Sequence, residues 1–251
     1  MSILKELTEE YFGEKVRKED EINIDGLDVE IVPFTDKNGK FHKKGYKPKG
    51  GNVLKELLKR MIEVRGDEGD FNDIDTSDIK NMATLFKENE TFNGDISGWD
   101  VSKVLNMGYM FEGATSFNQD ISKWEFPEVT NMYSMFEGAK SFNQDISKWK
   151  FPEVTDMCGM FNGATSFNQP IGDWKFPKVT DMEGMFEDAT SFNQPIGDWK
   201  FPKVITMCSM FNGATSFNQD LSSWDLTNIN TEDFFHKDCP IKDEFKPKIM
   251  K

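Results

Sequence analysis

The stretch FNQDISKWKFPEVTDMCGMFNGATS, residues 142–166, is one copy of a unit that recurs every 25 residues without insertion or deletion. The tryptophan of the unit marks this period at Trp99, Trp124, Trp149, Trp174, Trp199 and Trp224. A catalytic group is needed once, so a motif copied in register indicates a structural role. A fixed period of this length is typical of a solenoid, in which each unit packs against its neighbours.

Two segments of the unit carry the structural prediction. The segment DISKWKF, residues 145–151, suits a short strand or an extended turn. The segment VTDMCGMF, residues 154–161, places its apolar residues on one helical face, with Thr155 or Asp156 to cap its start and Gly163 to end it. We therefore predict an α/β fold: a right-handed solenoid of about six 25-residue coils, each with a short parallel strand and a short helix.

The consensus string VTxMxxMFxGAxSFNQDISxW resembles the leucine-rich repeats of BspA-type bacterial surface proteins, especially the variant of about 25 residues found in mycoplasma lipoproteins. The resemblance covers residues 69–235. It implies a leucine-rich-repeat solenoid in which Phe and Met take many leucine positions. It also implies a cell-surface location and a role in protein binding or adhesion. The sequence as given shows no leader or lipobox cysteine, which favours the cytoplasm, so both locations stay open.

The two ends of the array are expected to carry caps, because the terminal coils of a solenoid would otherwise expose their apolar faces. We predict a small helix and β-meander module in residues 1–50, a capping helix in 51–68, the repeats in 69–235 and a C-terminal cap in 236–251. The first of these regions is either a separate module or an extended cap.

Turn signals refine these end regions. Asp25-Gly26 lies between apolar residues in alternation and predicts a hairpin, and Asn38-Gly39 predicts a second turn. Three apolar residues are expected to close the C-terminal end of the array: Phe234, Phe235 and Ile241.

Charge narrows the classes of partner. The net charge is −14, and residues 69–235 carry 11 Lys and Arg against 26 Asp and Glu. Such a negative array repels phosphate backbones and anionic membrane surfaces. No apolar run is long enough to span a membrane. We therefore expect a protein partner, with a host matrix or surface protein as one candidate, no nucleic acid, no membrane insertion and a monomeric chain.

Two invariant columns are interpreted as internal structure. The asparagines are expected to form a buried ladder of amides that satisfies backbone groups in successive coils: Asn118, Asn143, Asn168, Asn193 and Asn218. The tryptophans are expected to be core residues, although a stacking platform for ligands is an alternative: Trp124, Trp149, Trp174 and Trp199.

Two other columns give weaker indications of function, one of calcium binding and one of ice binding. An Asp column at Asp95, Asp120, Asp145 and Asp220 provides carboxylates for calcium, but Pro170 and Pro195 interrupt it and the spacing of a calcium loop is missing. A threonine column of the kind that binds ice is interrupted by Lys140. We therefore predict no metal site.

Catalysis has little support in the residues. The chain has two histidines, His42 and His236, and no spacing typical of a nucleophile with its base or of a metal centre. Cys158 and Cys208 occupy the same repeat position two coils apart, about 10 Å at the spacing of a parallel ladder, which is beyond disulfide reach. We expect free thiols, no enzyme activity and no cofactor.

Function is therefore sought in positions that change from coil to coil. Beside the invariant tryptophan, the variable charged residues form a candidate interaction face on the predicted strand side: Lys123, Glu125, Lys148, Lys150, Asp173, Lys175, Asp198 and Lys200. Solenoids commonly use such faces for binding. The expected function is a non-enzymatic protein-interaction or adhesion module, and the alternative is an intracellular structural scaffold without a host ligand.

Overall fold

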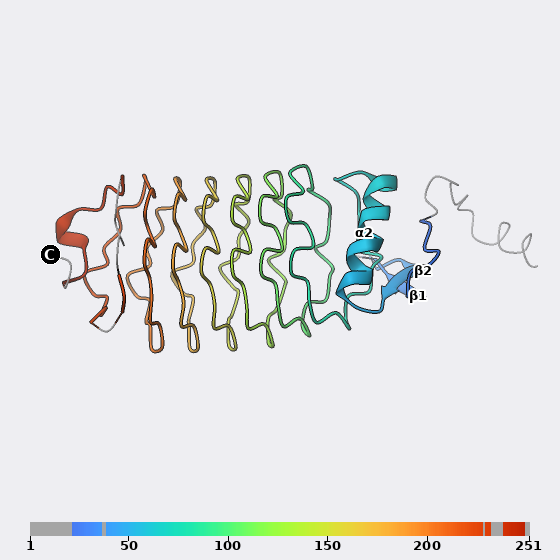
Figure 1. Ribbon diagram of the computed structural model, residues 1–251, viewed down its shortest axis with the longest axis horizontal. Coiled ribbons are helices and arrows are strands. Elements are labelled where there is room, and N and C mark those ends of the chain that lie inside the picture. The colour runs from blue at the N-terminus through green and yellow to red at the C-terminus, as the bar shows by residue number, and fades with distance from the viewer. Residues whose placement is uncertain (1–21, 37–38, 228, 232–237, 249–251) are drawn as a thin grey trace, which may run out of the picture.

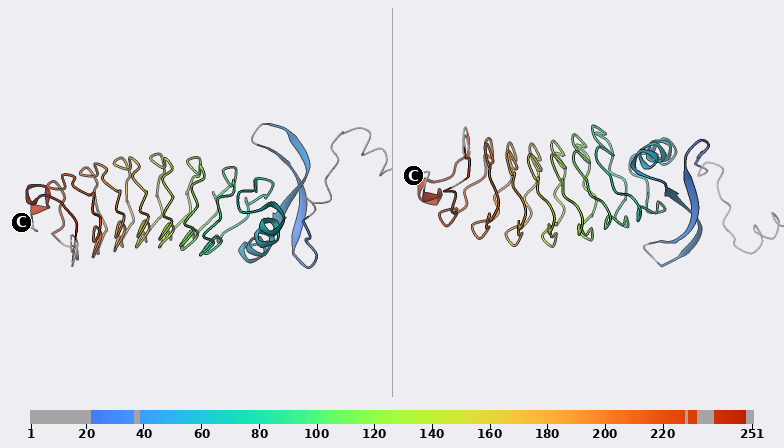
Figure 2. Two further views of the ribbon diagram at one scale, coloured as in Figure 1. Left: turned by 90° about the horizontal axis from the view of Figure 1, so that it is seen from above. Right: turned by 60° about the horizontal axis from the view of Figure 1, so that its bottom comes forward.

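The repeats form a row of coils that lie side by side along the long axis of the molecule (Figure 1). The computed structural model describes residues 22–36, 39–227, 229–231 and 238–248. At one end of the row lie strands β1 (Val29–Thr35) and β2 (Phe41–Pro48) and helix α2 (Gly51–Arg65). The short 3₁₀ helix η2 (Asp243–Phe245) lies at the other end. Two further views show the same order of coils between these ends (Figure 2).

Neighbouring coils are joined through their backbones. One parallel bridge connects each pair along a single column: Asn81–Asn106, Asn106–Asn131, Asn131–Asp156, Asp156–Asp181, Asp181–Thr206 and Thr206–Asn230. Beyond the bridge, alternate backbone N–H groups donate to carbonyls of the next coil. In one coil these donors are Met107, Tyr109, Phe111 and Gly113, with N···O distances of 2.7–3.0 Å. Each coil therefore bonds directly to the next.

The helix predicted in each repeat is wrong: the segment is a series of turns in the described coils. Tyr109 and Gly113 have φ angles of 60° and 69°, whereas an α-helix needs negative φ at every residue. The intervening N–H groups fold back three residues, as from Met110 to Met107 at 3.2 Å. Half of the donors that a helix would use internally are thus used between coils.

The strand predicted over residues 145–151 is also wrong, because β1 and β2 are the only strands in the described part of the chain. Two turns occupy the segment instead. Asp145 Oδ1 accepts the Ser147 N–H at 2.9 Å, and the Trp149 N–H donates to the Ile146 carbonyl at 3.1 Å. The parallel bridges lie in the segment that was predicted to begin the helix. The right-handed winding of the coils stays a prediction.

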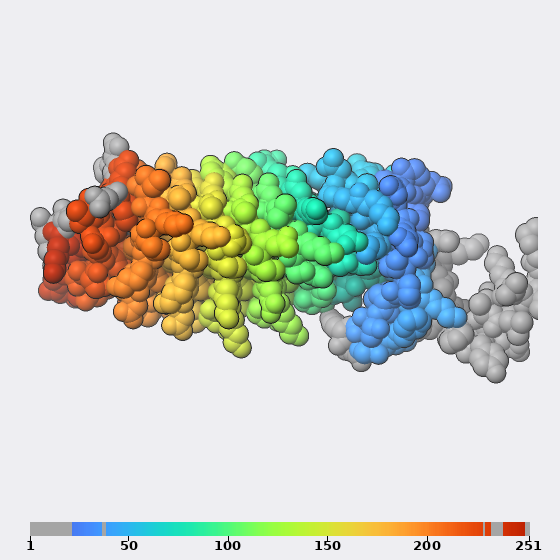
Figure 3. Space-filling model, turned by 90° about the horizontal axis from the view of Figure 1, so that it is seen from below, coloured from blue at the N-terminus to red at the C-terminus, as the bar shows by residue number. Residues whose placement is uncertain are grey.

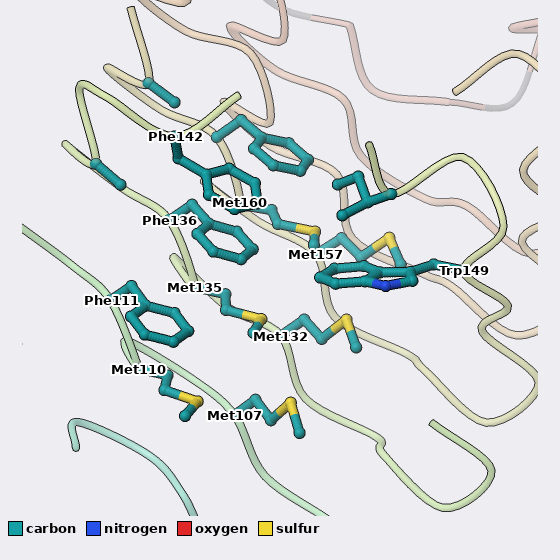
Figure 4. Packing of buried hydrophobic residues seen from close by; sticks show 14 of the residues in the cluster. Met107, Met110, Phe111, Met132, Met135, Phe136, Phe142, Trp149, Met157 and Met160 are labelled. Atoms are coloured by element: carbon teal, nitrogen blue, oxygen red, sulfur yellow. The ribbon is translucent and has the colours of Figure 1, made fainter. Parts of the chain in front are cut away.

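Equivalent apolar side chains lie over one another and form the core (Figure 4). Met107, Met132 and Met157 make one row, and the rings of Phe111 and Phe136 stack with centroids 5.4 Å apart. All of these side chains are fully buried. Because each ring packs on its own copy, the same residue types fit at the same position in every coil.

The N-terminal elements cover the first coil. Helix α2 buries the side of its surface that carries Leu54, Leu57, Leu58 and Met61, and these join one continuous core with the repeats. Strands β1 and β2 pair antiparallel, with an irregularity between Val32 and Phe34. Their connection spans residues 36–40, at the predicted Asn38-Gly39 turn, of which Asn38 lies outside the described residues. Asp25-Gly26 forms a turn ahead of β1 rather than the predicted hairpin.

The N-terminal elements are also bonded to the array. Tyr46 of β2 makes a parallel bridge to Ile74 in the first coil. Arg65, the last residue of α2, forms two hydrogen bonds of 2.6 and 2.7 Å with the carboxylate of Asp73. Residues 22–50 therefore act as an extension of the cap and not as a detached module.

The C-terminal segment covers the last coil. The Lys242 N–H donates to Asn218 Oδ1 at 3.1 Å, and the Leu221 N–H donates to the Phe245 carbonyl at 2.8 Å. Ile241 is buried, as the sequence suggested, whereas Phe234 and Phe235 lie outside the described residues. This segment thus takes the place of a further coil.

Candidate interaction groove

Two columns of stacked phenylalanine rings differ in the spacing of their rings. Equivalent rings in the column of Phe111 lie 5.4–5.8 Å apart from coil to coil. In the column of Phe126, Phe151, Phe176 and Phe201 the spacing is 6.4 Å at every step. The rings of the Trp-x-Phe-Pro segments are thus spaced more widely than those of the Phe111 column. Successive coils stand out as separate ridges along one edge of the array in Figure 3.

A groove of about 840 Å³ crosses three coils on this face. We call it the Trp-Phe-Pro groove. Its lining comes from residues 124–127, 147–152 and 173–177: Trp124, Glu125, Phe126, Pro127, Ser147, Lys148, Trp149, Lys150, Phe151, Pro152, Asp173, Lys175 and Pro177.

The groove has an apolar floor. Phe126 meets the edge of Trp149 with ring centroids 4.7 Å apart, and both rings are almost fully buried. Pro127 and Pro152 are exposed beside them. Proline has no backbone N–H, so these positions offer apolar surface in place of a donor.

The rim of the groove is charged, with a surplus of lysine. Lys148, Lys150 and Lys175 are exposed, and none forms an ion pair within the described part of the chain. Glu125 and Asp173 provide the opposing charges. On the same side of the array, Lys178 is by contrast paired with Glu153. The groove therefore has one more positive than negative side chain in its lining, on a chain whose net charge is −14.

Five of the eight residues predicted for the interaction face line this groove. The other three are exposed outside the lining: Lys123 precedes Trp124 in the first coil of the groove, and Asp198 and Lys200 lie at the equivalent positions of the next coil. The predicted face is thus a continuous surface with its hollow in the middle. The sequence did not indicate that the prolines and phenylalanines would be part of it, because they belong to the invariant pattern.

The asparagine column forms the predicted ladder, but at the surface. Asn143 Oδ1 accepts the Asn168 N–H at 2.9 Å, and the same bond recurs in every coil from Asn93 to Asn218. These side chains are half-buried or exposed, so the prediction of a buried ladder is wrong. The neighbouring glutamines also take part: Gln169 Nε2 donates to the Asn143 carbonyl at 2.8 Å.

The tryptophans are core residues and offer no stacking platform, since they are 1–4% exposed. Trp149, Trp174 and Trp199 each donate their indole N–H to an isoleucine carbonyl of the preceding coil at 3.0–3.3 Å. Trp124 differs, because its indole N–H has no partner among the described residues. The tryptophans shape the groove by supporting it.

The remaining columns are occupied by structural bonds. Asp120 and Asp145 are each hydrogen-bonded by the side chain and by the backbone N–H of the serine two residues later, and these bonds lower the pKa of both carboxyls. Among the described residues no cluster of His, Cys, Asp and Glu has the arrangement of a metal site. The three cysteines are free and half-buried. Burial and the nearby Asp181 carboxylate raise the pKa of the Cys158 thiol to about 12, which makes it a poor nucleophile.

Comparison with known proteins places this architecture in a family. A family model described as a mycoplasma protein of unknown function (DUF285) matches the chain twice, over residues 54–157 and 145–246. The chain belongs to this family. Each match covers several of the repeated coils, so the chain is a repeat protein of mycoplasma type. No curated protein and no solved structure matches it. In the described part of the chain, no helix has the length and apolar character needed to cross a membrane.

Proposed function

We propose that this DUF285 protein is a non-enzymatic protein-interaction module and that the Trp-Phe-Pro groove is its binding surface. The observation that carries the proposal is the combination of an apolar floor with three unpaired lysines. Apolar surface supplies most of the affinity of protein interfaces, while charges at the rim guide association and fix the orientation of the partner.

The shape of the site favours a polypeptide as partner. The groove runs across three coils and is open, whereas small-molecule sites bury most of their ligand. Charges of both signs on the rim, Glu125 and Asp173 with the lysines, suit a partner with mixed side chains better than a uniform polyanion. The net charge of −14 adds a general repulsion against nucleic acid.

A leucine-rich-repeat-like solenoid fold and a cell-surface location are part of the same proposal. Bonds between neighbouring coils support a leucine-rich-repeat-like solenoid, although the repeats contain turns where such folds have strands and helices. Adhesion to a host matrix or surface protein is the narrower form of the proposed function. The structural scaffold without a ligand is the competing function, and it predicts that changes in the groove have no effect on association.

Site-specific cross-linking tests the proposal. A photoreactive phenylalanine derivative at position 152, in the groove, is expected to cross-link one partner polypeptide in cells of the source organism. The same group at position 140, which is exposed but outside the groove, serves as the control. The double variant Lys150→Glu, Lys175→Glu should abolish the cross-link at position 152. Cross-linking that survives this variant, or that is equal at both positions, would contradict the groove as the binding surface.

A further inference from the structure

We propose that an extended acidic segment of a partner protein occupies the Trp-Phe-Pro groove and continues past its end to Lys200 in the next coil, along the stack with two residues per coil. The inference rests on the proposed function and adds to it the conformation, direction and charge pattern of the ligand. Two features carry it: the spacing of the phenylalanine rings on this face and the order of charges in one column.

The ring spacing matches an extended chain. On this face the phenylalanine rings of successive coils are 6.4 Å apart, centroid to centroid, from Phe126 to Phe151, from Phe151 to Phe176 and from Phe176 to Phe201. An extended polypeptide rises about 3.2–3.4 Å per residue, or about 6.4–6.8 Å for two residues. A strand-like segment that runs across the coils would therefore meet each coil with every second side chain. The narrower spacing of 5.4 Å between Phe111 and Phe136 would lose this register within a few coils.

The charges repeat at the same interval. The position that follows the invariant tryptophan is Lys150, Lys175 and Lys200 in three successive coils. All three are exposed and lack an ion pair among the described residues. Acidic side chains at alternate positions of an extended segment would each face one lysine. Because the intervening side chains point the other way, they need not be charged.

Acidic residues mark the ends of this lysine column. The position after tryptophan is Glu125 in the preceding coil and Asp225 in the following coil, and both side chains are exposed. A fourth acidic residue of the ligand would meet a like charge at either end, which is unfavourable. The column therefore selects a segment with three acidic residues at alternate positions, five residues in length.

Fluorescence anisotropy with two labelled peptides tests the register. The first peptide, Val-Asp-Val-Asp-Val-Asp-Val, has its acids at alternate positions and β-branched residues that favour an extended chain. The second, Val-Val-Asp-Asp-Asp-Val-Val, has the same composition and net charge. With the full chain at low salt, we expect the first peptide to bind about threefold or more tightly than the second, the equivalent of about one exposed charge pair.

Charge-reversal variants test the lysines. The triple variant Lys150→Glu, Lys175→Glu, Lys200→Glu should weaken binding of the alternating peptide by about tenfold or more. The control Lys59→Glu, Lys80→Glu, Lys140→Glu changes the net charge equally at exposed lysines outside the groove and should leave binding within about twofold. Circular dichroism checks the folding of both, and a Lys→Gln series replaces the Lys→Glu series if reversal disturbs the fold.

Several results would overturn the inference. Equal binding of the two peptides would contradict the two-residue register, and equal weakening by the two triple variants would reduce the effect to net charge. An oligothymidine that binds as tightly as the alternating peptide would contradict the choice of a polypeptide. The first two results do not bear on cross-linking at position 152, so the inference can fail while the proposed function stands. Tight binding of the oligothymidine, or the absence of a cross-link when all groove lysines are intact, would contradict both.

Discussion

Asn168 illustrates how one side chain links three coils. Its N–H donates to Asn143 Oδ1 in the preceding coil, and its own Oδ1 accepts the N–H of Asn193 and the Nε2 of Gln194 in the next, each at 2.9 Å. An amide oxygen can accept two hydrogen bonds, so its capacity is fully used. The repetition of Asn-Gln is therefore explained by the bonding needs of the coil edge.

Removing this oxygen should destabilise the protein. We expect Asn168→Ala to lower the free energy of unfolding by about 1–3 kcal/mol, because the Asn193 N–H loses its partner. Because the Asn168 side chain is half-exposed, water can hydrogen-bond to the Asn193 N–H in its place, so we expect a loss near the lower end of this range. Urea denaturation measures the change. Asn168→Asp keeps the accepting oxygen and should recover most of the loss; equal losses would contradict the acceptor role.

Asp156 offers a second prediction at this scale. Burial, and then repulsion from Asp181, raises the pKa of its carboxyl, while the Cys158 N–H bond to Oδ1 opposes the shift. A carboxyl with a raised pKa in the folded state destabilises the fold when ionised at neutral pH, and this penalty disappears as pH falls through the folded value. The preceding coils have Asn106 and Asn131 at this position.

We therefore expect Asp156→Asn to stabilise the protein at pH 7, with the gain shrinking as the solution becomes acidic enough to protonate the wild-type carboxyl. Thermal unfolding of both proteins at several pH values measures it. The asparagine keeps the acceptor for the Cys158 N–H, so a loss of stability at pH 7 would show that the charge itself is needed.

The elements show where sequence patterns predict structure and where they fail. The apolar stripe of α2 predicted a helix because a helix with one buried face has an unambiguous period. The repeats have a similar spacing of apolar residues but fold as turns, since left-handed residues interrupt each coil. Tyr109 and Ser134, with φ of 60° and 49°, occupy this position, and neither residue type signals positive φ.

Asp78 pairs with Lys47 of the N-terminal cap and with Lys103 of the array. We expect the stability of this cap in acid to depend on Asp78. Hydrogen bonds and charges from Lys103 and Lys47 hold the pKa of Asp78 at about 2, below its usual 3.8. Because the folded pKa is depressed, its contribution is present above the ordinary value and is lost as pH falls through about 2. We expect Asp78→Asn to reduce the loss of stability between pH 4 and pH 2.

The effect is measured by comparing the protection of β2 amides from hydrogen exchange in wild type and in Asp78→Asn between pH 4 and pH 2. Strand β2 is chosen because it contains Lys47. Lys246 with Asp243, a similar exposed pair at the other end, provides a control through Asp243→Asn, which should leave β2 unchanged. An identical acid response in wild type and Asp78→Asn would assign the cap's acid sensitivity to other carboxyls.

At the scale of the whole molecule, the array should tolerate loss of a complete coil. Deleting residues 145–169 removes one period and leaves every column in register across the junction. We expect a folded, cooperatively unfolding chain of lower stability, because it has one interface fewer. Circular dichroism and thermal unfolding measure this. Deleting residues 145–156 removes about half a period, breaks the ring stacks and should prevent folding; equal outcomes would contradict neighbour-by-neighbour packing.

The extent of the candidate site could be predicted only in part. The positions beside Trp149 were found because they vary while the core does not, and five of those residues line the groove. The hollow itself has no signal in the sequence, because its lining combines side chains of three coils that only the folded stack brings together. The ring columns also differ in spacing, 5.4–5.8 Å beside Phe111 and 6.4 Å beside Phe126, and this difference depends on packing throughout the stack.

The unequal spacing also couples mechanics to recognition. Bending the rod toward the Trp-Phe-Pro face would bring Lys150, Lys175 and Lys200 closer together, and bending it away would separate them. A ligand that fits the 6.4 Å interval would resist bending of the coils that it spans. By the same reciprocity, tension or bending applied through the two caps would change the affinity of the groove for the proposed ligand.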